Sequence, residues 1–435
     1  MPNMNLNINN FGPINKAKIE LNKLNVIAGV NGSGKTTSSK LLYCFLTSNS
    51  NEKDYLANIT IDERFKTLIT SLYYDVEFDS ETLNKLKKLI DAFPRLTDKI
   101  YNDKLKNCIN SLKIIINESQ INNKDVYLEK LNTVETALEV NSIEHRKFFE
   151  VSNVLLNSEF RYKDLKLKGY DVQLNGKEND CEFSYKLDLY DSKLGFIIEN
   201  GDLACPNIKN IIYIDSPSIF NSIGLRETLI LEKQPYHLRF LSRLLNTPKN
   251  IEDVHDSLFY QKLDEYNDEI TEMLGGFIYY DDEEREFLFK TDNDEYSMKN
   301  TSSGVKQLGI IQMLLSNRTL TENSFLIMDE PEVNLHPEWQ VKFAKIIILM
   351  IKDLNISIFI NSHSPQFIEA LEVYSAKYGL SNETKFYLSE QVSETKKYNF
   401  KEIKRKNLTK LYNNLGDPYD KIDEIRIENA FKGIE

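Results

Sequence analysis

The first thirty residues alternate between apolar and polar side chains, a pattern typical of short strands. MNLNI (residues 4–8) precedes a turn at Gly12-Pro13, and INKAKIEL (14–21) and LNVIA (24–28) follow it. From Ser38 to Thr47, leucine and phenylalanine then recur at helical spacing. We therefore expect strands, a glycine-rich loop and a helix in this order.

The middle of the chain changes pattern twice. Residues 51–157 are rich in Lys, Asn and Leu at mostly helical spacing, with breaks at Pro94 and at the polar run NESQINNKD. Residues 160–200 return to alternation in EFSYKLDLY and LGFIIE, which turn-forming polar clusters separate. This order predicts a long, mostly helical insertion followed by a β-rich segment.

The C-terminal half predicts a parallel sheet. IIYID (211–215) is a compact apolar strand, and a helical block runs from about Leu225 to Leu274. Gly275-Gly276 then opens a predicted hairpin, FIYYDDEEREFLFK, whose acidic centre we expect in a solvent-exposed turn. From Ser303 to about Leu371 helices and strands alternate, which is typical of a parallel sheet. Two further strands, KFYLSE and KYNFKEI, and a helical end follow.

Composition narrows the class of protein. The chain has 435 residues, of which 41% are hydrophobic and 28% charged, as in globular proteins. This length suggests one elaborated catalytic domain or two lobes. The formal net charge of −12 disfavours a chain that coats nucleic acid with its whole surface, although a local basic groove stays open. The densest basic stretch, residues 396–410, fits either such a groove or a solvated face of mixed charge.

The sequence predicts neither a membrane span nor a secretory signal. The longest apolar run, residues 346–351, lies between two lysines and is too short to cross a bilayer. The N-terminus lacks a basic start, an apolar stretch and a cleavage site, so we expect a cytoplasmic protein. Four scattered cysteines lack paired spacing and are expected as free thiols rather than in disulfides or a zinc site: Cys44, Cys108, Cys181 and Cys205.

One glycine-rich segment carries a complete phosphate-binding pattern. Residues 29–36 read GVNGSGKT and match GxxxxGK[ST] at every position, between a predicted strand and a predicted helix. The backbone N–H groups of such a loop wrap a phosphate, and a side chain at Gly32 or Gly34 would obstruct them. The helix that follows adds the positive end of its dipole. An accidental glycine-rich turn is the alternative, but it does not require this strand and this helix.

The loop predicts ATP and Mg²⁺ as ligands. Lys35 should reach the β- and γ-phosphates, and the Thr36 hydroxyl should coordinate Mg²⁺. Thr37 is expected to donate a hydrogen bond to the α-phosphate. The predicted nucleotide-binding residues of the loop are Gly29, Asn31, Gly32, Ser33, Gly34, Lys35, Thr36 and Thr37.

A hydrophobic strand farther along the chain ends in two acids. Residues 325–328 are followed by Asp329 and Glu330, then by the turn PEVNLHP and a helix from Pro337. At the carboxyl end of a buried strand, Asp329 can hold Mg²⁺ through water, and Glu330 can orient or deprotonate an attacking water. A strand that runs into solvent would also end in two acids, but it would not explain the turn and helix that follow.

Two further segments complete the predicted site. The strand from Ile356 to Ile360 ends at NSHS, which places His363 where it can sense a γ-phosphate, although a lone histidine is more often structural. TSSGVKQL (residues 301–308) opens a helix whose first turn leaves free N–H groups beside Ser302, Ser303 and Gly304. An ordinary helix cap would read the same, yet its place before the two-acid strand favours a nucleotide-sensing signature. The predicted catalytic residues are Glu330, His363 and Lys35.

In this order, the motifs resemble those of the ABC-type ATPase superfamily, and more narrowly those of the AAA-type group related to OLD nucleases, RecF and SMC heads. GVNGSGKT resembles the Walker A motif, TSSGVKQL the signature, LIMDEPEVNLHP the Walker B motif with its D-loop, and NSHSPQFI the switch-histidine segment. The resemblance covers residues 4–48 and 295–372 directly. It implies an α/β P-loop NTPase head with an antiparallel β subdomain and a long, mostly helical insertion.

We accordingly divide the chain into four parts. Residues 1–50 are the N-terminal part of the ATPase head, and 51–210 are the mostly helical insertion with its β-rich segment. Residues 211–380 are the C-terminal part of the head, and 381–435 form a C-terminal tail.

The resemblance also implies an ATP-sandwiched homodimer, or a higher oligomer, whose sites join the loop, the acids and His363 of one copy to Ser302 and Gly304 of the other. Two departures matter. The signature differs from the LSGGQ of transporters, and no Q-loop glutamine can be placed. OLD relatives carry a C-terminal Toprim nuclease, whereas the residues after His363 lack the spaced acids of two-metal cleavage.

Two functions fit these observations. The first is a dimeric ATPase switch that regulates a separate effector protein in anti-phage or stress defence. The alternative is a RecF- or SMC-like ATPase that binds DNA in repair, through a basic groove and in a salt-sensitive way. The acidic net charge and the lack of a long heptad repeat weigh against the alternative. A transporter subunit, which would need a coupling surface for membrane helices, is the weakest candidate.

Overall fold

The computed structural model describes most of the chain in two compact units. The first unit comprises Met1–Leu46, Leu156–Leu187 and Ile198–Glu435, and the second comprises Thr47–Leu155 and Asp188–Ile197. The described residues are 3–50, 52–75, 80–91, 101–118, 124–141, 144–160, 169–178, 181–190, 193–201, 206, 208, 210–222, 234–246, 258–409, 411–412 and 425–427.

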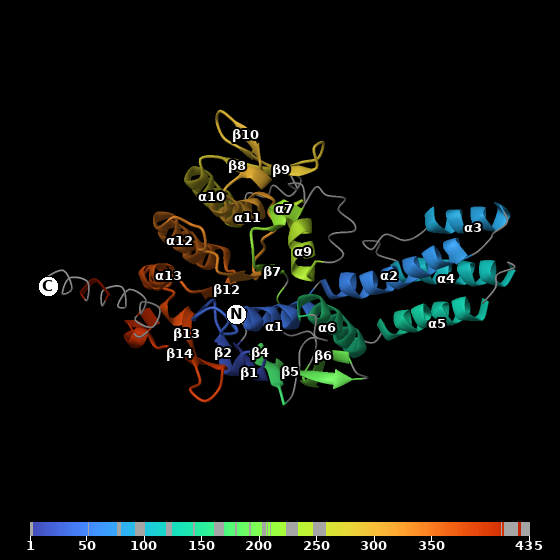
Figure 1. The fold of residues 1–435 in the computed structure, drawn as a ribbon, viewed down its shortest axis with the longest axis horizontal. Helices are drawn as coiled ribbons and strands as arrows, with labels where there is room; N and C mark the ends of the chain where they lie inside the picture. The colour runs from blue at the N-terminus through green and yellow to red at the C-terminus, as the bar shows by residue number, and fades with distance from the viewer. Residues whose placement is uncertain are drawn as a thin grey trace. The chain divides into compact units, whose positions relative to one another are not determined.

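The main strands of the first unit belong to a mixed eleven-stranded sheet (Figure 1). Its strand order is β6-β5-β4-β1-β2-β14-β13-β3-β12-β11-β7. The bounds of these strands are β1 Asn3–Phe11, β2 Ile14–Leu21, β3 Leu24–Ala28, β4 Asp171–Glu178, β5 Cys181–Tyr190, β6 Lys193–Asn200, β7 Ile211–Ile214, β11 Phe325–Asp329, β12 Ser357–Ser362, β13 Thr384–Gln391 and β14 Tyr398–Glu402. The strands predicted from alternation and from apolar runs are therefore confirmed.

Five strands of this sheet are parallel, and their carboxyl ends meet at one edge. β13, β3, β12, β11 and β7 run in the same direction. Every residue of β3 and β11 is buried, as expected for parallel strands covered on both faces. The register sets Asp329 beside Asn361 and sets Ala28 beside Ser362. The end of the strand before the glycine-rich loop thus lies next to the segment that carries His363.

The other strands form a mostly antiparallel part, as the fold class predicts, although β14 pairs parallel with β2. β1 pairs antiparallel with β2 and with β4, and β4 pairs with β5. In β1, Met4, Leu6 and Ile8 are buried while the asparagines between them are partly exposed, so one face lies on the core. β13 and β14 lie inside the sheet between β3 and β2, whereas the predicted boundary at residue 380 separates them from the head. Pairing between strands distant in sequence decides this arrangement.

The helices of the first unit begin and end at recognisable sequence signals. Residue Pro337 opens α12 with His336 as its cap, and Asn355 ends it in the left-handed conformation with φ 54°. α10 packs on α11 and α12, and α12 packs on α13 (Figure 1). The helix bounds are α1 Lys35–Ser48, α7 Ile219–Ser222, α9 Tyr236–Leu245, α10 Leu258–Leu274, α11 Ser303–Ser316, α12 Pro337–Leu354 and α13 Pro365–Lys377.

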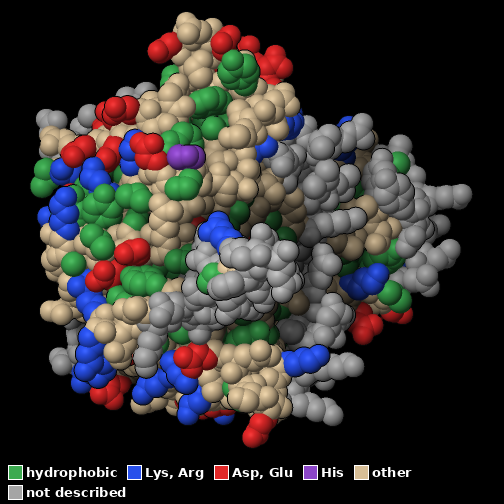
Figure 2. Space-filling view, turned by 60° about the vertical axis from the view of Figure 1, so that its left-hand side comes forward, with side chains coloured by type: hydrophobic (Ala, Val, Ile, Leu, Met, Phe, Trp, Pro, Cys, Tyr) green, Lys and Arg blue, Asp and Glu red, His purple; other side chains and the backbone are tan. Residues whose placement is uncertain are grey.

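A small three-stranded sheet stands apart from the main one. It consists of β8 (Phe277–Asp281), β9 (Glu286–Lys290) and β10 (Glu295–Ser297) in the order β10-β9-β8. The turn between β8 and β9 exposes residues 282–285, and acidic side chains gather in this region at the top of the view in Figure 2. The predicted hairpin and its exposed acidic turn are confirmed.

The second unit is a helical assembly with its own apolar core. Its helices are α2 Glu52–Asp75, α3 Ser80–Asp91, α4 Tyr101–Glu118, α5 Lys124–Asn141 and most of α6, Glu144–Phe160. Four of these helices, α2 to α5, contribute the buried apolar side chains, among them Phe65, Leu105, Leu112 and Leu131. This matches the mostly helical insertion that the sequence predicts.

The described cysteines form no disulfides. Cys44 and Cys108 are buried, Cys181 is partly exposed, and all three are free thiols; Cys205 lies outside the described residues. Among the residues that the structure describes, no histidine, cysteine and carboxylate side chains cluster as metal ligands. No helix in the same part of the chain has the length and apolar character needed to span a bilayer.

Candidate active site

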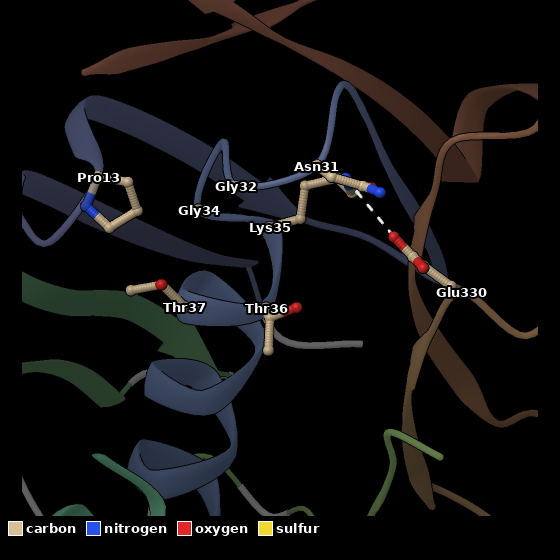
Figure 3. Close-up of a pocket in the computed structure, with 8 residues that line it drawn as sticks. All are labelled: Pro13, Asn31, Gly32, Gly34, Lys35, Thr36, Thr37 and Glu330. Atoms are coloured by element: carbon tan, nitrogen blue, oxygen red, sulfur yellow. Dashed lines mark ion pairs between the residues drawn. The ribbon is translucent and has the colours of Figure 1, made fainter. Parts of the chain in front are cut away.

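The glycine-rich loop wraps one side of an open cavity of about 260 Å³ (Figure 3). It connects the end of β3 to the start of α1 at Lys35. Gly34 has φ 98°, and a Cβ atom added there would lie 2.6 Å from Ile14 Cγ1, so a side chain does not fit. The cavity is lined by Pro13, Asn31, Gly32, Gly34, Lys35, Thr36, Thr37 and Glu330.

Lys35 supplies a buried cation to this cavity. Only 5% of the residue is exposed, and its Nζ donates to the carbonyl oxygens of Gly29 at 2.9 Å and Val30 at 3.1 Å. Burial lowers the pKa of Lys35, and neighbouring carboxylates, Glu330 foremost, offset part of the decrease. The Nζ atom lies 3.8 Å from Glu330 Oε1, across the cavity from the loop (Figure 3). The loop thereby holds a positive charge where a phosphate would contact its N–H groups.

Asp329 ends β11 as a buried carboxylate with several donors. Its Oδ1 accepts hydrogen bonds from Ser39 Oγ at 3.1 Å and from the Asn361 side chain, and its Oδ2 accepts one from the Tyr213 hydroxyl at 2.7 Å. The Thr36 hydroxyl lies close enough to lower the pKa of this carboxylate. Burial raises the pKa of Asp329, and these hydrogen bonds offset part of the rise.

The pairing of Asp329 with Thr36 fits a magnesium ion. Hard cations such as Mg²⁺ take oxygen ligands, and Mg²⁺ is commonly held by one or two protein oxygens together with substrate phosphates and water. Thr36 is exposed and lines the cavity, whereas Asp329 is 7% exposed just behind it. Both residues could therefore supply oxygen ligands to an ion held beside the phosphates, Thr36 directly and Asp329 through water.

Glu330 has a backbone conformation that is rare for glutamate. Its φ is 48°, in the left-handed region. Its N–H donates to Asn361 O at 2.8 Å, and its carbonyl accepts from Val333 N at 3.0 Å, so the surrounding turn holds this conformation. The side chain points toward the cavity, and Oε1 lies 3.3 Å from His363 Nδ1. Such strain is typical of functional sites, because it fixes a side chain in a required position.

His363 is supported by a carboxylate that the sequence did not single out. Glu332 is buried, and its Oε1 accepts from Ser362 Oγ at 2.6 Å and from His363 N at 3.3 Å. Burial raises the pKa of Glu332, and the hydrogen bond from Ser362 opposes this rise. The His363 ring itself is 42% exposed. Glu332 therefore fixes the backbone from which His363 extends toward Glu330.

The signature segment lies outside the cavity of its own chain. Ser302 caps α11, and its Oγ accepts from Val305 N at 3.3 Å. A Cβ atom added at Gly304 would lie 2.7 Å from Asn334 O, so the start of α11 packs closely on the turn after Asp329 and Glu330. Ser302 and Ser303 are exposed. The described residues that line the cavity do not include Ser302, Ser303 or Gly304.

The structure thus brings most of the predicted site residues together and leaves the signature apart. Lys35, Glu330 and His363 form one cluster, and Asp329 lies behind Thr36. Sequence reasoning missed the residues that hold these groups in place. Asn361 directly follows a predicted strand and Tyr213 lies within another, but no spacing along the chain connects either residue to Asp329. The missed residues are Ser39, Tyr213, Glu332 and Asn361.

The fold and the cavity together define a P-loop ATPase domain. The family described as the AAA ATPase domain matches residues 4–368. This match spans most of the chain, and the protein belongs to that family.

Several solved structures show a remote similarity in fold. An SMC head bound to the C-terminal winged-helix domain of ScpA is 11% identical, with a TM-score of 0.44 over 94% of this chain and 100% of that one. The SMC head domain from Thermotoga maritima is 12% identical, with a TM-score of 0.38 over 93% and 99%. An SMC head with an extended coiled coil, bound to the C-terminal domain of ScpA from Pyrococcus furiosus, is 11% identical, with a TM-score of 0.31 over 98% and 100%. These similarities are too remote to transfer any function, and no curated protein matches the chain.

Proposed function

We propose that this protein binds ATP with Mg²⁺ and hydrolyses it at a site shared by two copies of the chain. The observation that supports this most directly is the contact of Glu330 with both Lys35, at 3.8 Å, and His363, at 3.3 Å, at the edge of the phosphate-loop cavity. A carboxylate beside the phosphates and beside a histidine suits the activation of an attacking water.

Each side chain has a distinct part in this proposal. Lys35 and the N–H groups of the loop bind the β- and γ-phosphates, and Thr37 and Asn31 border the same cavity. Thr36 and Asp329 would hold Mg²⁺, which when bound neutralises charge on the phosphate oxygens. Glu330 accepts the proton of the attacking water, and His363 contacts the γ-phosphate and orients Glu330.

The exposed signature supports the participation of a second copy. The first turn of α11 is a helix N-terminus whose cap, Ser302, accepts from Val305 N, and such a terminus binds anions favourably. Ser302 and Ser303 are exposed there, away from the cavity of their own chain. In a head-to-tail pair, this turn of one copy would cover the γ-phosphate bound by the other. ATP would then close the dimer and hydrolysis would open it.

Three substitutions test the composite site. Lys35→Ala should lose ATP binding, whereas Glu330→Gln should bind ATP and accumulate a closed dimer, with turnover reduced by about 10²–10⁴-fold. Ser302→Arg should keep ATP affinity and lose the dependence of turnover on protein concentration. Ser393→Arg places the same charge at another exposed serine and is the matched control. If Ser302→Arg keeps the wild-type turnover rate and its dependence on protein concentration, the hypothesis of a site shared by two copies is ruled out.

We further propose that the closed dimer regulates a separate effector protein in anti-phage or stress defence. This part rests on the resemblance of the four motifs to the OLD-related group. Co-purification of a partner with Glu330→Gln in ATP, and its release by ADP, would support it. If the partner binds the wild-type protein equally well in ATP and in ADP, the nucleotide does not control the interaction, which would contradict the proposed switch.

DNA binding in repair is the alternative, and the basic stretch at residues 396–410 is its best candidate surface. In this stretch Lys401 pairs with Glu390, and Arg405 donates to Ser375 Oγ at 2.6 Å and lies 3.9 Å from Glu372. Basic and acidic side chains are interspersed on the face in Figure 2. This pairing supports a solvated face. ATP-dependent binding that weakens steeply with salt would favour the DNA alternative instead.

A further inference from the structure

A buried network of side chains lies behind Asp329, on the side away from the cavity loop. Tyr213 comes from β7, the strand next to β11, and its hydroxyl donates to Asp329 Oδ2 at 2.7 Å. Tyr213 is 1% exposed. Because a carboxylate oxygen can only accept, the Tyr213 hydroxyl is the donor of this hydrogen bond.

A histidine fixes the ring of Tyr213 in turn. The centroid of the Tyr213 ring lies 4.5 Å from that of the His237 ring and 5.7 Å from that of the Tyr43 ring. His237 is buried, with Nδ1 2.7 Å from Glu159 Oε2 and Nε2 3.0 Å from Asp215 Oδ2. Nδ1 is hydrogen-bonded to Glu159, whereas Nε2 forms an ion pair with Asp215 without a well-aligned hydrogen bond. A carboxylate beside each ring nitrogen favours the imidazole that carries both protons and holds the ring in this position.

The two oxygens of Asp329 depend on different partners. Ser39 and Asn361 hold Oδ1, and Tyr213 holds Oδ2 from the far edge of the sheet. A carboxylate with donors on only one oxygen can turn about its last bond, which would change the direction of its free lone pairs. Groups that bind a metal ligand from behind set the orientation of that ligand and contribute to metal affinity.

We propose that Tyr213 is a positioning residue for Asp329, and that His237, anchored by Glu159 and Asp215, fixes Tyr213 so that this network sets the Mg²⁺ affinity of the ATP site. The proposal rests on the proposed function in one respect, namely that Asp329 serves the magnesium ion. It adds two residues that no motif contains and that do not touch the nucleotide cavity. Their effect is exerted through the orientation of one carboxylate.

The test is the Mg²⁺ dependence of equilibrium binding of a non-hydrolysable ATP analogue to the full-length chain. Tyr213→Phe keeps the ring and removes the hydroxyl. We expect the Mg²⁺ concentration at half-saturation to rise by about tenfold or more, as for other losses of a partner behind a metal ligand. Binding of the analogue in EDTA should stay unchanged. Titration with Mn²⁺, followed by its electron paramagnetic resonance signal, gives a second readout independent of turnover.

Tyr387→Phe is the matched control. Tyr387 is buried in β13, and its hydroxyl accepts from Glu20 N at 2.9 Å and donates to Glu20 O at 3.3 Å. The substitution therefore removes a hydrogen-bonded tyrosine hydroxyl from the same sheet without changing the contacts of Asp329. This variant should keep the wild-type Mg²⁺ dependence. His237→Asn keeps a donor near Glu159 but removes the contact with Asp215, and we expect it to raise the half-saturating Mg²⁺ concentration by about threefold, less than Tyr213→Phe.

The outcomes separate this inference from the function on which it rests. A wild-type protein that depends on Mg²⁺, with Tyr213→Phe and His237→Asn both unchanged, would overturn the network alone. A wild-type protein whose nucleotide affinity ignores Mg²⁺ would overturn the assignment of Asp329 as well. Equal shifts in Tyr213→Phe and Tyr387→Phe would show a general loss of stability and would also overturn the positioning role.

Discussion

Raising the pH from 6 to 10 should lower the free energy of unfolding of the first unit, because the buried His237 loses its charge in this range. Burial lowers the pKa of His237, but hydrogen bonds and charges from Asp215 and Glu159 outweigh burial and raise the pKa from 6.5 to about 9. Between these two values the unfolded chain has released the proton and the folded chain still holds it. Unfolding therefore releases a proton, and a higher pH favours it.

The size of the effect follows from the shift. The stabilisation is complete below the unfolded pKa of 6.5 and is lost as the pH rises through about 9. At about 1.4 kcal/mol for each unit, the full loss amounts to about 3 kcal/mol. The side chain of His237 is 0% exposed, so solvent screening does little to reduce this value.

The assay is urea unfolding at several pH values, followed by the fluorescence of Trp339. This residue is the single tryptophan of the chain and lies in α12 of the first unit, so the signal reports on that unit. His237→Asn removes the titrating group and is the reference for every other group that titrates. The free energy of unfolding of the wild type should fall by about 3 kcal/mol more than that of the variant. Parallel pH profiles of the two proteins would refute the reasoning.

Substitutions at three positions probe other local features of the first unit. Gly34→Ala should lower ATP affinity and stability by about 1–3 kcal/mol, measured by calorimetry, since its φ of 98° and the approach to Ile14 exclude a side chain. Glu332→Ala should lower the free energy of unfolding by about 1–3 kcal/mol and slow ATP turnover, because His363 N loses its acceptor and His363 is displaced. Glu332→Gln keeps an acceptor and should therefore keep most of the turnover rate. Asn355→Val should lower the unfolding free energy by about 1–2 kcal/mol because of its φ of 54°, with Asn355→Gly near wild type; equal losses would contradict this.

Much of the fold was readable from local pattern. The start of α11 at Ser303 follows from a capping serine, and the start of α12 follows from a proline at its first position. β3 and β11 are short apolar runs, which suits strands buried on both faces. Segments with clear periodicity and end signals form the predicted element, because neighbours in sequence determine backbone preference and capping.

The sheet order was not readable in this way. β13 is a predicted strand, yet its place beside β3, at the centre of the first unit, depends on pairing with residues more than three hundred positions earlier. A hydrophobic strand can pair with any strand of compatible register and burial. The choice among them depends on how all the helices and strands pack together, which no local window contains.

The same contrast holds for the site. GVNGSGKT, the two acids after β11 and the histidine after β12 are short motifs, and their residue types carry their chemistry, so inspection of the chain was enough to name Lys35, Thr36, Asp329, Glu330 and His363. The groups that hold Asp329 are Ser39, 290 positions away, and Tyr213, 116 positions away. Only the folded sheet brings them to one carboxylate, because hydrogen bonds form between atoms close in space and have no fixed spacing along the chain.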